Sequence, residues 1–298
     1  MKKLALLLGA LSLVSSVAYA KEVVPAVEEV VVVEEAAPVA AAPALTVTNV
    51  GQYIEIDNTS GRDGADIGEA VHFANVVGLV YDDWTFGLMA RKAWSMDTDD
   101  GIHSNGHRID LDVWKNFENF SVGARWRQEA NKDRWLLRTK YSYGMFSGWV
   151  DAGYEFNNTD AEDNIYSEGM PVAVTVGPVT LGYYYEYFGY DDMNADKVEE
   201  EIRHQVRAMF PLYTGEKLSL SAEYRYQFAN DFEVKEDAPY KENNRHIGII
   251  NANYAVTDAL SVYGYYEYDW NKYDGQNGYK VDHDDYYGEF CIGWNYAF

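Results

Sequence analysis

Arginine and acidic side chains alternate with apolar ones in several stretches of this 298-residue chain. In residues 120–129, Arg125 and Arg127 lie two positions apart, and Ala124 and Trp126 flank Arg125. Successive side chains of a β-strand point to opposite faces, so this spacing puts the arginines on one face and the apolar groups on the other. Guanidinium groups donate several N–H bonds to carboxylate and hydroxyl groups. Such a face is predicted to bind polar solutes or to form ion pairs.

The same alternation assigns a set of charged side chains to the inner face of a rolled sheet, where they would line a pore and contact passing solutes. These predicted pore-lining residues are Arg108, Asp110, Asp112, Arg125, Arg127, Arg134, Arg138, Lys140, Arg203, Arg207, Glu223, Arg225, Glu267 and Glu289. Bases dominate residues 107–143 and 201–228, whereas acids lie on the intervening strands, such as Asp151, Glu155, Glu186, Glu267 and Glu289. This separation predicts an electric field across a water-filled channel. The alternative is that the charges pair and fill a closed barrel.

Two other groups of residues have side chains that could act in catalysis or bind a metal. Asp282-His283-Asp284-Asp285 has the acid and histidine of some proteases, but it is surrounded by further acids and is interpreted as solvated charge. His103 and His107 are four residues apart on a predicted loop, where this spacing does not bring two imidazoles to one metal. No glycine-rich phosphate loop is present. We therefore predict no enzymatic activity, no catalytic residue, no metal site and no cofactor.

The last residues of the chain indicate which elements hold these charges. Phe290, Ile292, Trp294, Tyr296 and Phe298 occupy every second position, and polar or small residues lie between them. A strand between lipid and a watery lumen needs that division, whereas a water-facing sheet rarely exposes so many large apolar groups. The aromatic last residue is similar to the closing-strand signal of bacterial outer-membrane barrels. The alternative is the C-terminal strand of a soluble β-sandwich.

The same period predicts fourteen strands from residue 45 onward. They are residues 45–57, 69–81, 84–94, 107–117, 120–129, 133–143, 147–156, 165–176, 179–189, 201–212, 217–228, 245–256, 260–270 and 283–298. Short connections such as Asp82-Asp83 and Gly177-Pro178 alternate with long acidic ones such as 58–68, 95–106 and 229–244. Outer-membrane barrels have this asymmetry of tight periplasmic turns and long extracellular loops. We predict an all-β fold, a transmembrane antiparallel β-barrel of about 14 strands, although about 12 or about 16 would also suit strands of about 9–11 residues.

The chain is predicted to have three parts. Residues 1–20 have a charged start, an apolar stretch and a small-residue cleavage site, which are typical of a secretory signal peptide. Residues 21–44 are rich in Ala, Val, Glu and Pro and are interpreted as a low-complexity periplasmic tether, and residues 45–298 form the barrel. Removing the signal peptide and its two lysines changes the formal charge from −24 to −26, which argues against nucleic-acid binding. The single cysteine, Cys291, is interpreted as a small residue facing the lumen.

Several stretches resemble the monomeric fourteen-stranded family known as outer membrane porin G. They are Val179–Tyr187 with Asp191–Met193, Glu201–Arg203 with Phe210–Leu212, Leu260–Val262 with Tyr266–Tyr268, and Gly293–Phe298. The resemblance implies a weakly selective, monomeric channel for small saccharides and other small solutes. In that family a histidine pair closes the channel in acid. Glu242 and Tyr273 take those positions here, so the resemblance does not extend to acid gating.

The sequence therefore predicts a porin of the bacterial outer membrane that allows passive diffusion of sugars and ions. Its expected partners are the lipid bilayer, small solutes and, through the strand ending at Phe298, the barrel-assembly machinery; it is expected to be a monomer. One alternative is a structural or adhesive barrel that acts through its acidic loops. The other is a channel for acidic sugars, because arginine tracks such as Arg125, Arg127, Arg134 and Arg138 resemble those of oligosaccharide-specific porins.

Overall fold

The computed structural model describes residues 44–61, 64–97, 101–159, 162–191, 198–234, 240–275 and 284–298. The predicted signal peptide and residues 21–43 of the predicted tether lie outside these residues. The described residues belong to a unit that begins at Pro43. Within this described part, no helix is long and apolar enough to cross a membrane.

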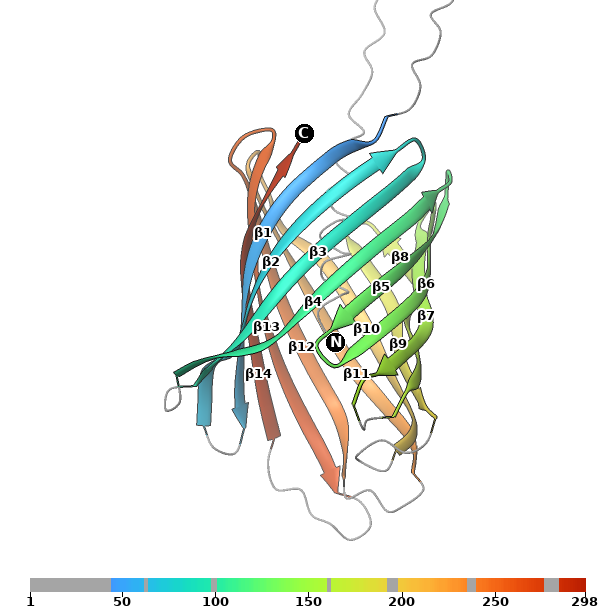
Figure 1. Cartoon of the computed structure of the whole chain (residues 1–298), viewed down its shortest axis with the longest axis vertical. Coiled ribbons are helices and arrows are strands. Elements are labelled where there is room, and N and C mark those ends of the chain that lie inside the picture. The colour runs from blue at the N-terminus through green and yellow to red at the C-terminus, as the bar shows by residue number, and fades with distance from the viewer. Residues whose placement is uncertain are drawn as a thin grey trace, which may run out of the picture. The chain divides into compact units, whose positions relative to one another are not determined.

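Fourteen antiparallel strands form a closed barrel in this unit (Figure 1). The strands are β1 (Thr46–Gly61), β2 (Gly64–Tyr81), β3 (Trp84–Asp97), β4 (Gly101–Asn116), β5 (Phe120–Glu129), β6 (Lys132–Tyr143), β7 (Phe146–Asn157), β8 (Asn164–Val176), β9 (Val179–Tyr190), β10 (Val198–Thr214), β11 (Leu218–Val234), β12 (Tyr240–Ala255), β13 (Leu260–Gly275) and β14 (Asp284–Ala297). Each strand pairs with its neighbours in sequence, and β1 pairs with β14 to close the ring. The predicted fold class and strand number are confirmed.

Tight turns join the strands at one end of the barrel. Two-residue turns connect β2 to β3, β6 to β7 and β8 to β9. Asp82, Gly144 and Gly177, the first residues of these turns, have φ of 52°, 59° and 59°. This left-handed conformation matches the twist of paired strands and suits glycine, because a Cβ atom disfavours it. The predicted short connections are therefore confirmed at these turns.

At the other end the strands are longer than the sequence pattern predicts. The predicted loop 58–68 is mostly strand, since β1 and β2 pair as far as Gly61 and Gly64. The predicted loop 95–106 is shortened in the same way, because β3 and β4 pair as far as Asp97 and Gly101. The prediction was wrong here because it relied on an apolar face. Beyond the lipid, backbone pairing continues without one.

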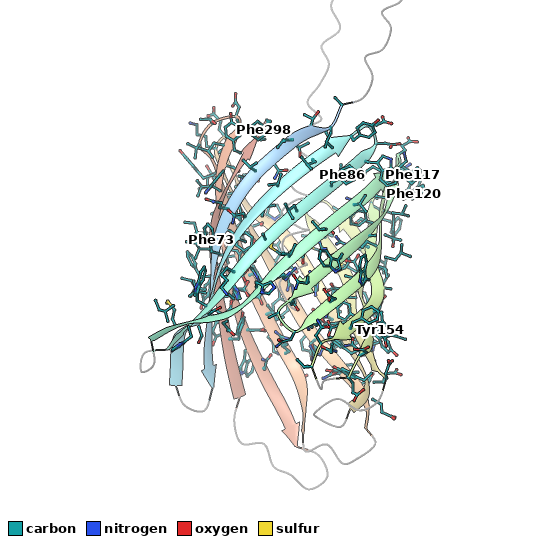
Figure 2. All side chains as sticks on the ribbon, viewed as in Figure 1. Phe73, Phe86, Phe117, Phe120, Tyr154 and Phe298 are labelled. Atoms are coloured by element: carbon teal, nitrogen blue, oxygen red, sulfur yellow. The ribbon has the colours of Figure 1, made fainter. Side chains whose placement is uncertain are left out.

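The outer surface of the barrel is apolar across its middle and aromatic towards both ends. Large apolar side chains exposed there include Leu88, Leu111, Leu137, Leu181, Val206, Ile250 and Ile292. Near the tight turns, Phe117 and Phe120 stack with their ring centroids 4.4 Å apart, and Phe298 lies at the same end (Figure 2). Tyr154 packs on Phe156 at the opposite end. An apolar band between two aromatic girdles is the surface of a barrel that spans a lipid bilayer.

Closure of the ring completes the requirements for a membrane-spanning barrel. Lipid offers no partner to backbone N–H and C=O groups, so a spanning sheet must have no edge. The pairing of β1 with β14 removes both edges, and it extends to a bond from the Phe298 N–H to the Thr48 carbonyl at 3.0 Å. A closed, single-chain antiparallel barrel with an apolar exterior places this chain in the bacterial outer membrane.

One glycine gives a direct test of the pairing between β6 and β7. Gly153 lies opposite Leu136, and a Cβ atom added to it would meet the Trp135 carbonyl oxygen at 1.7 Å. We expect G153A to lower the free energy of unfolding by at least about 1–3 kcal/mol, the usual cost of overpacking. The matched control is G248A, because a Cβ there meets nothing within 4 Å. Urea unfolding of the purified barrel should separate the two variants, and equal midpoints would contradict the register.

Labelling on intact cells tests the orientation. Asn158 follows β7 at the end opposite the tight turns, and Asn119 lies in the connection between β4 and β5. In a C291S background, N158C should react with a membrane-impermeant maleimide on intact cells. N119C should react only after the outer membrane is permeabilised. The reverse pattern would mean that the tight turns face outward.

Candidate functional site

The structure places the predicted pore-lining residues on the inner side of the barrel wall. On β5 and β6, buried positions alternate with exposed ones, as expected when one face points inward. Ten of the residues are buried: Arg108, Asp110, Arg125, Arg127, Arg134, Arg138, Arg207, Arg225, Glu267 and Glu289. Asp112, Arg203 and Glu223 are half-buried, and Lys140 is exposed. His72 on β2 is also buried, whereas Asn75 on the same strand is exposed.

The carboxylate of Asp110, at the centre of β4, binds two neighbouring arginines. Asp110 accepts bonds from Arg108 at 3.0 and 2.6 Å and from Arg127 at 3.0 and 3.1 Å. Two donors from each guanidinium reach the same carboxylate, the geometry that makes arginine–carboxylate pairs strong and directional. Asp110 is 2% exposed and would be costly to bury as a charge without these partners. The carboxylate therefore fixes both arginine side chains against the wall.

A continuous ion-pair chain crosses four strands from β4 to β7. Asp112 accepts two bonds from Arg125, at 2.7 and 2.5 Å, and a third from Arg138 at 2.6 Å. Arg138 also bonds Asp151 on β7 at 2.8 Å. The register explains the chain, since Asp112 lies opposite Arg125 and Arg138 lies opposite Asp151. Most of the arginine charge predicted to face solutes is thus shared with carboxylates.

Some donors in this chain are nonetheless not used by the protein. The Arg125 Nη1 and Arg138 Nη2 atoms are buried and donate to no protein acceptor. Arg125 Nη1 is 3.8 Å from an oxygen of Asp110, which is too long for a hydrogen bond. Both atoms are also shielded from solvent, so these guanidinium groups stay within the ion-pair chain and present no free donor to the lumen.

Aromatic rings on the inner face support other arginines. The Arg134 guanidinium carbon lies 3.8 Å from the centre of the Tyr166 ring, and that of Arg207 lies 3.4 Å from the centre of the Tyr184 ring. Sequence reasoning missed these rings. Tyr183, Tyr184 and Tyr185 are consecutive, so the two faces of β9 cannot be separated by polarity. Cation–π contacts of this kind orient a guanidinium without neutralising it.

Further ion pairs lie on β11 to β13. Arg225 bonds Glu223 on its own strand, and it lies 3.8 Å from Glu267 on β13. Arg245 on β12 bonds Asp269 on β13 through two nitrogens. Sequence reasoning did not select Arg245 or Asp269. Both lie near the ends of predicted strands, where the apolar alternation that marks the faces stops.

Acidic side chains gather on the wall formed by β13, β14 and β1. Glu289 on β14 lies between Glu267 on β13 and Asp57 on β1 in the strand register. Glu55 is the next inward residue on β1. The hydroxyl of Tyr265 donates to Glu55 at 2.8 Å and also bonds Glu289. Hydroxyl donors therefore stabilise this negative wall where arginine is scarce.

The described inner face is divided into a basic and an acidic side. On β4 to β7 it carries seven bases and five acids: Arg108, Arg125, Arg127, Lys132, Arg134, Arg138 and Lys140, with Asp110, Asp112, Glu129, Asp151 and Glu155. On β12 to β14 and β1 it carries one arginine and five acids: Arg245, with Glu267, Asp269, Glu289, Glu55 and Asp57. β5 and β6 are half-way round the ring from β12 and β13. A net positive side thus faces a net negative side, but the division differs from the predicted one, because Asp151 and Glu155 pair with Arg138 and Arg134 on the basic side.

The positions compared with the acid-gating histidines can also be located. Glu242 on β12 and Tyr273 on β13 are directly paired in the strand register.

The groups considered for catalysis or metal binding are only partly described. His103 and His107 lie on β4 rather than on a loop, which corrects that prediction. Residues 276–283, which include His283, lie outside the described residues.

Comparisons with known proteins add the following. No protein-family model matches the chain, and no curated protein does. Among solved structures, OmpT, an outer membrane protein of Vibrio cholerae, is 15% identical, with 88% of this chain and 100% of that chain covered and a TM-score of 0.45. An anion-selective porin from Comamonas acidovorans is 11% identical, with coverages of 86% and 100% and a TM-score of 0.44. The outer membrane channel DcaP of Acinetobacter baumannii is 10% identical, with coverages of 87% and 99% and a TM-score of 0.43. Identities this low carry no information on solutes, and the barrel fold rests on the strand pairing itself.

A double-mutant cycle tests the ion-pair chain. R138M leaves Asp112 and Asp151 without a shared donor, and breaking a buried pair in this way costs about 3–5 kcal/mol. Adding D151N should recover part of the loss, with a coupling energy of about 1–3 kcal/mol between the two sites. The control is K115M, which removes a half-exposed partner of Asp83 and should cost no more than about 1 kcal/mol. Strictly additive losses in urea unfolding would show that Arg138 and Asp151 do not interact.

Proposed function

We propose that this protein is a passive outer-membrane channel for small hydrophilic solutes such as sugars and ions. The observation that carries the proposal is the charged inner face of a closed fourteen-stranded barrel. A barrel of about eight strands is filled by its own side chains, and larger barrels enclose more space. Charged groups around such a lumen favour water, because their hydration is lost in a dry interior. This function is the one expected from the resemblance to the porin G family.

We further propose that the channel is only weakly selective by charge. The arginines of β4 to β7 share their charge with Asp110, Asp112 and Asp151, so the positive excess on that side is small. The acidic side opposes it across the lumen. Facing walls of opposite charge produce one field across the lumen, while their electrostatic potentials largely cancel along its axis. Such a field orients polar molecules more than it excludes either sign of ion.

Planar-bilayer recording tests the channel itself. Addition of the purified, folded protein should give stepwise increases in current, because each inserted barrel adds one water-filled path. Sugar-dependent swelling of liposomes should accompany it. A barrel that acts only as a structural or adhesive protein would insert without conductance and leave the liposomes unswollen.

Reversal potentials in a salt gradient test the opposed charges. Replacing Arg125, Arg127 and Arg138 by Ser should shift the reversal potential towards cation selectivity. The opposite variant, E267Q/D269N/E289Q, should shift it towards anion selectivity. K115S is the control and should leave it unchanged, because Lys115 lies outside the lumen beside Trp84. If neither triple variant moves the reversal potential, these side chains do not line the conducting path.

A further inference from the structure

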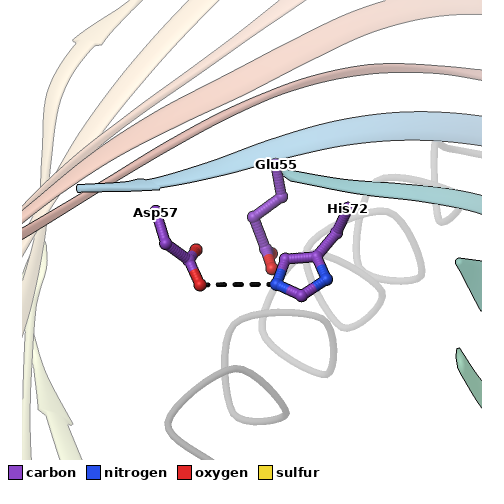
Figure 3. Close-up of side chains that lie close together, drawn as sticks. All are labelled: Glu55, Asp57 and His72. Carbon is purple, nitrogen blue, oxygen red and sulfur yellow. Dashed lines mark hydrogen bonds and ion pairs between the residues drawn. The ribbon is translucent and has the colours of Figure 1, made fainter. Parts of the chain in front are cut away.

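Three side chains of different ligand types meet on the acidic side of the lumen. Glu55 and Asp57 are alternate residues of β1 and share its inner face, and His72 on β2 lies directly opposite Glu55 in the strand register. One ligand atom from each of the three lies within 4.8 Å of those from the other two, and all three residues are buried (Figure 3). The imidazole edge faces the Asp57 carboxylate in Figure 3. This juxtaposition follows from strand pairing, and the proposed conduction does not require a metal ion there.

Neighbouring groups hold the Glu55 carboxylate in place. Arg91 on β3 donates to one of its oxygens at 3.3 Å, and the Tyr265 hydroxyl donates to the other at 2.8 Å. Hydrogen bonds of this kind orient the first ligands of metal sites and are characteristic of their surroundings. The Nε2 atom of His72 lies 3.3 Å from Asp57 Oδ2, so these two potential ligand atoms already face each other. The cluster is thus ordered before any ion binds.

The local charge also points to a divalent cation. Glu55, Asp57 and Glu289 bring three negative charges, and Arg91 brings one positive charge. Histidine binds metals in its neutral state, and a divalent ion held there would place positive charge beside these carboxylates.

We propose that Glu55, Asp57 and His72 form a binding site for a divalent transition-metal ion of the zinc type. One imidazole nitrogen with two carboxylate oxygens suits such ions, whereas Mg²⁺ and Ca²⁺ prefer oxygen ligands alone. Ligand atoms around a tetrahedral Zn²⁺ at about 2.0–2.2 Å lie about 3.3–3.6 Å apart. His72 Nε2 and Asp57 Oδ2 already have this spacing at 3.3 Å, and a pair at the 4.8 Å limit would have to approach by about 1.3 Å. Three protein ligands leave a coordination position for water or for an oxygen of a passing solute.

Small side chains lie opposite two of the three ligand residues in the strand register. Ala93 on β3 lies opposite His72, and Ala70 on β2 lies opposite Asp57. Neither alanine brings a bulky or basic side chain between the ligands. The other cross-strand neighbour of Glu55 is Cys291 on β14. The three atoms that meet within 4.8 Å come from the two carboxylates and the imidazole.

Equilibrium binding to the folded protein in detergent tests the proposal without using conductance. Isothermal titration with Zn²⁺ should show one site per chain, and Mg²⁺ at the same concentrations should not compete. Co²⁺ should bind in its place and give visible d–d absorption bands. H72A, H72N and D57N should each weaken Zn²⁺ binding at least tenfold and abolish the Co²⁺ bands. Two substitutions at His72 are used so that a folding defect in one does not decide the result, and urea midpoints report folding.

Two control variants test whether Zn²⁺ binds to another imidazole or to the thiol instead. H107A removes an exposed imidazole on β4, and C291S removes the thiol beside Glu55; both should bind Zn²⁺ like the unmodified chain. Unchanged affinity in folded H72A and D57N would overturn the proposal, and so would loss of binding in C291S or H107A. Because binding is measured in solution, a barrel that fails to conduct could still bind the metal, and the two proposals can fail independently.

Discussion

The absence of hydrogen-bond partners in lipid is the constraint on which the structure depends. Every backbone N–H and C=O of the spanning part must find its partner within the protein, and only a sheet without edges achieves this with strands. The bond network between β1 and β14 meets that need, although these strands lie at opposite ends of the barrel sequence. Once the ring is closed, each strand has an outer face in lipid and an inner face away from it. The period of two then determines where every charged side chain can lie.

The second constraint on the structure is the loss of solvation of the charged side chains that gather on the inner face. The inner face cannot hold unpaired charges at close range without a large loss of solvation, so carboxylates and guanidinium groups pair across adjacent strands. On β4 to β7 the pairs link into a chain through Asp112, Arg138 and Asp151. On β13, β14 and β1 acids predominate, and hydroxyl groups such as that of Tyr265 take the place of cations. The proposed transverse field and the proposed metal site are both consequences of this uneven pairing.

The fold could be predicted from the sequence because its signal is local. Apolar side chains alternate with polar or small ones in Phe290–Phe298 and around Arg125. This alternation within a single segment predicts a strand with one face in lipid, independently of the other strands. The ends of β1 to β4 that lie opposite the tight turns extend further than predicted. They could not be predicted, because strands beyond the lipid have no apolar face. The ion-pair partners of each arginine could not be predicted either. They depend on which residues of adjacent strands lie side by side, and the sequence alone does not set that register.

The Glu55, Asp57 and His72 cluster shows the same limit at a single site. Two residues come from one strand and the third from the next, separated by a connection of polar residues without a helical or metal-binding spacing. Only the pairing of Glu55 with His72 brings them together. Sites of this kind in barrels are invisible to motif searches because the ligands are neighbours across strands rather than along them.

The most direct test of the account is chemical modification of adjacent residues during current recording. Lys140 and Tyr141 are neighbours on β6; the first is exposed on the inner face, and the second is 38% exposed and faces lipid. In a C291S background, a bulky cationic thiosulfonate reagent should lower the single-channel current of K140C in a clear step. The same reagent should leave Y141C unchanged. Equal insensitivity of both variants, in channels that conduct, would show that the inner face of the barrel is not the path of the ions.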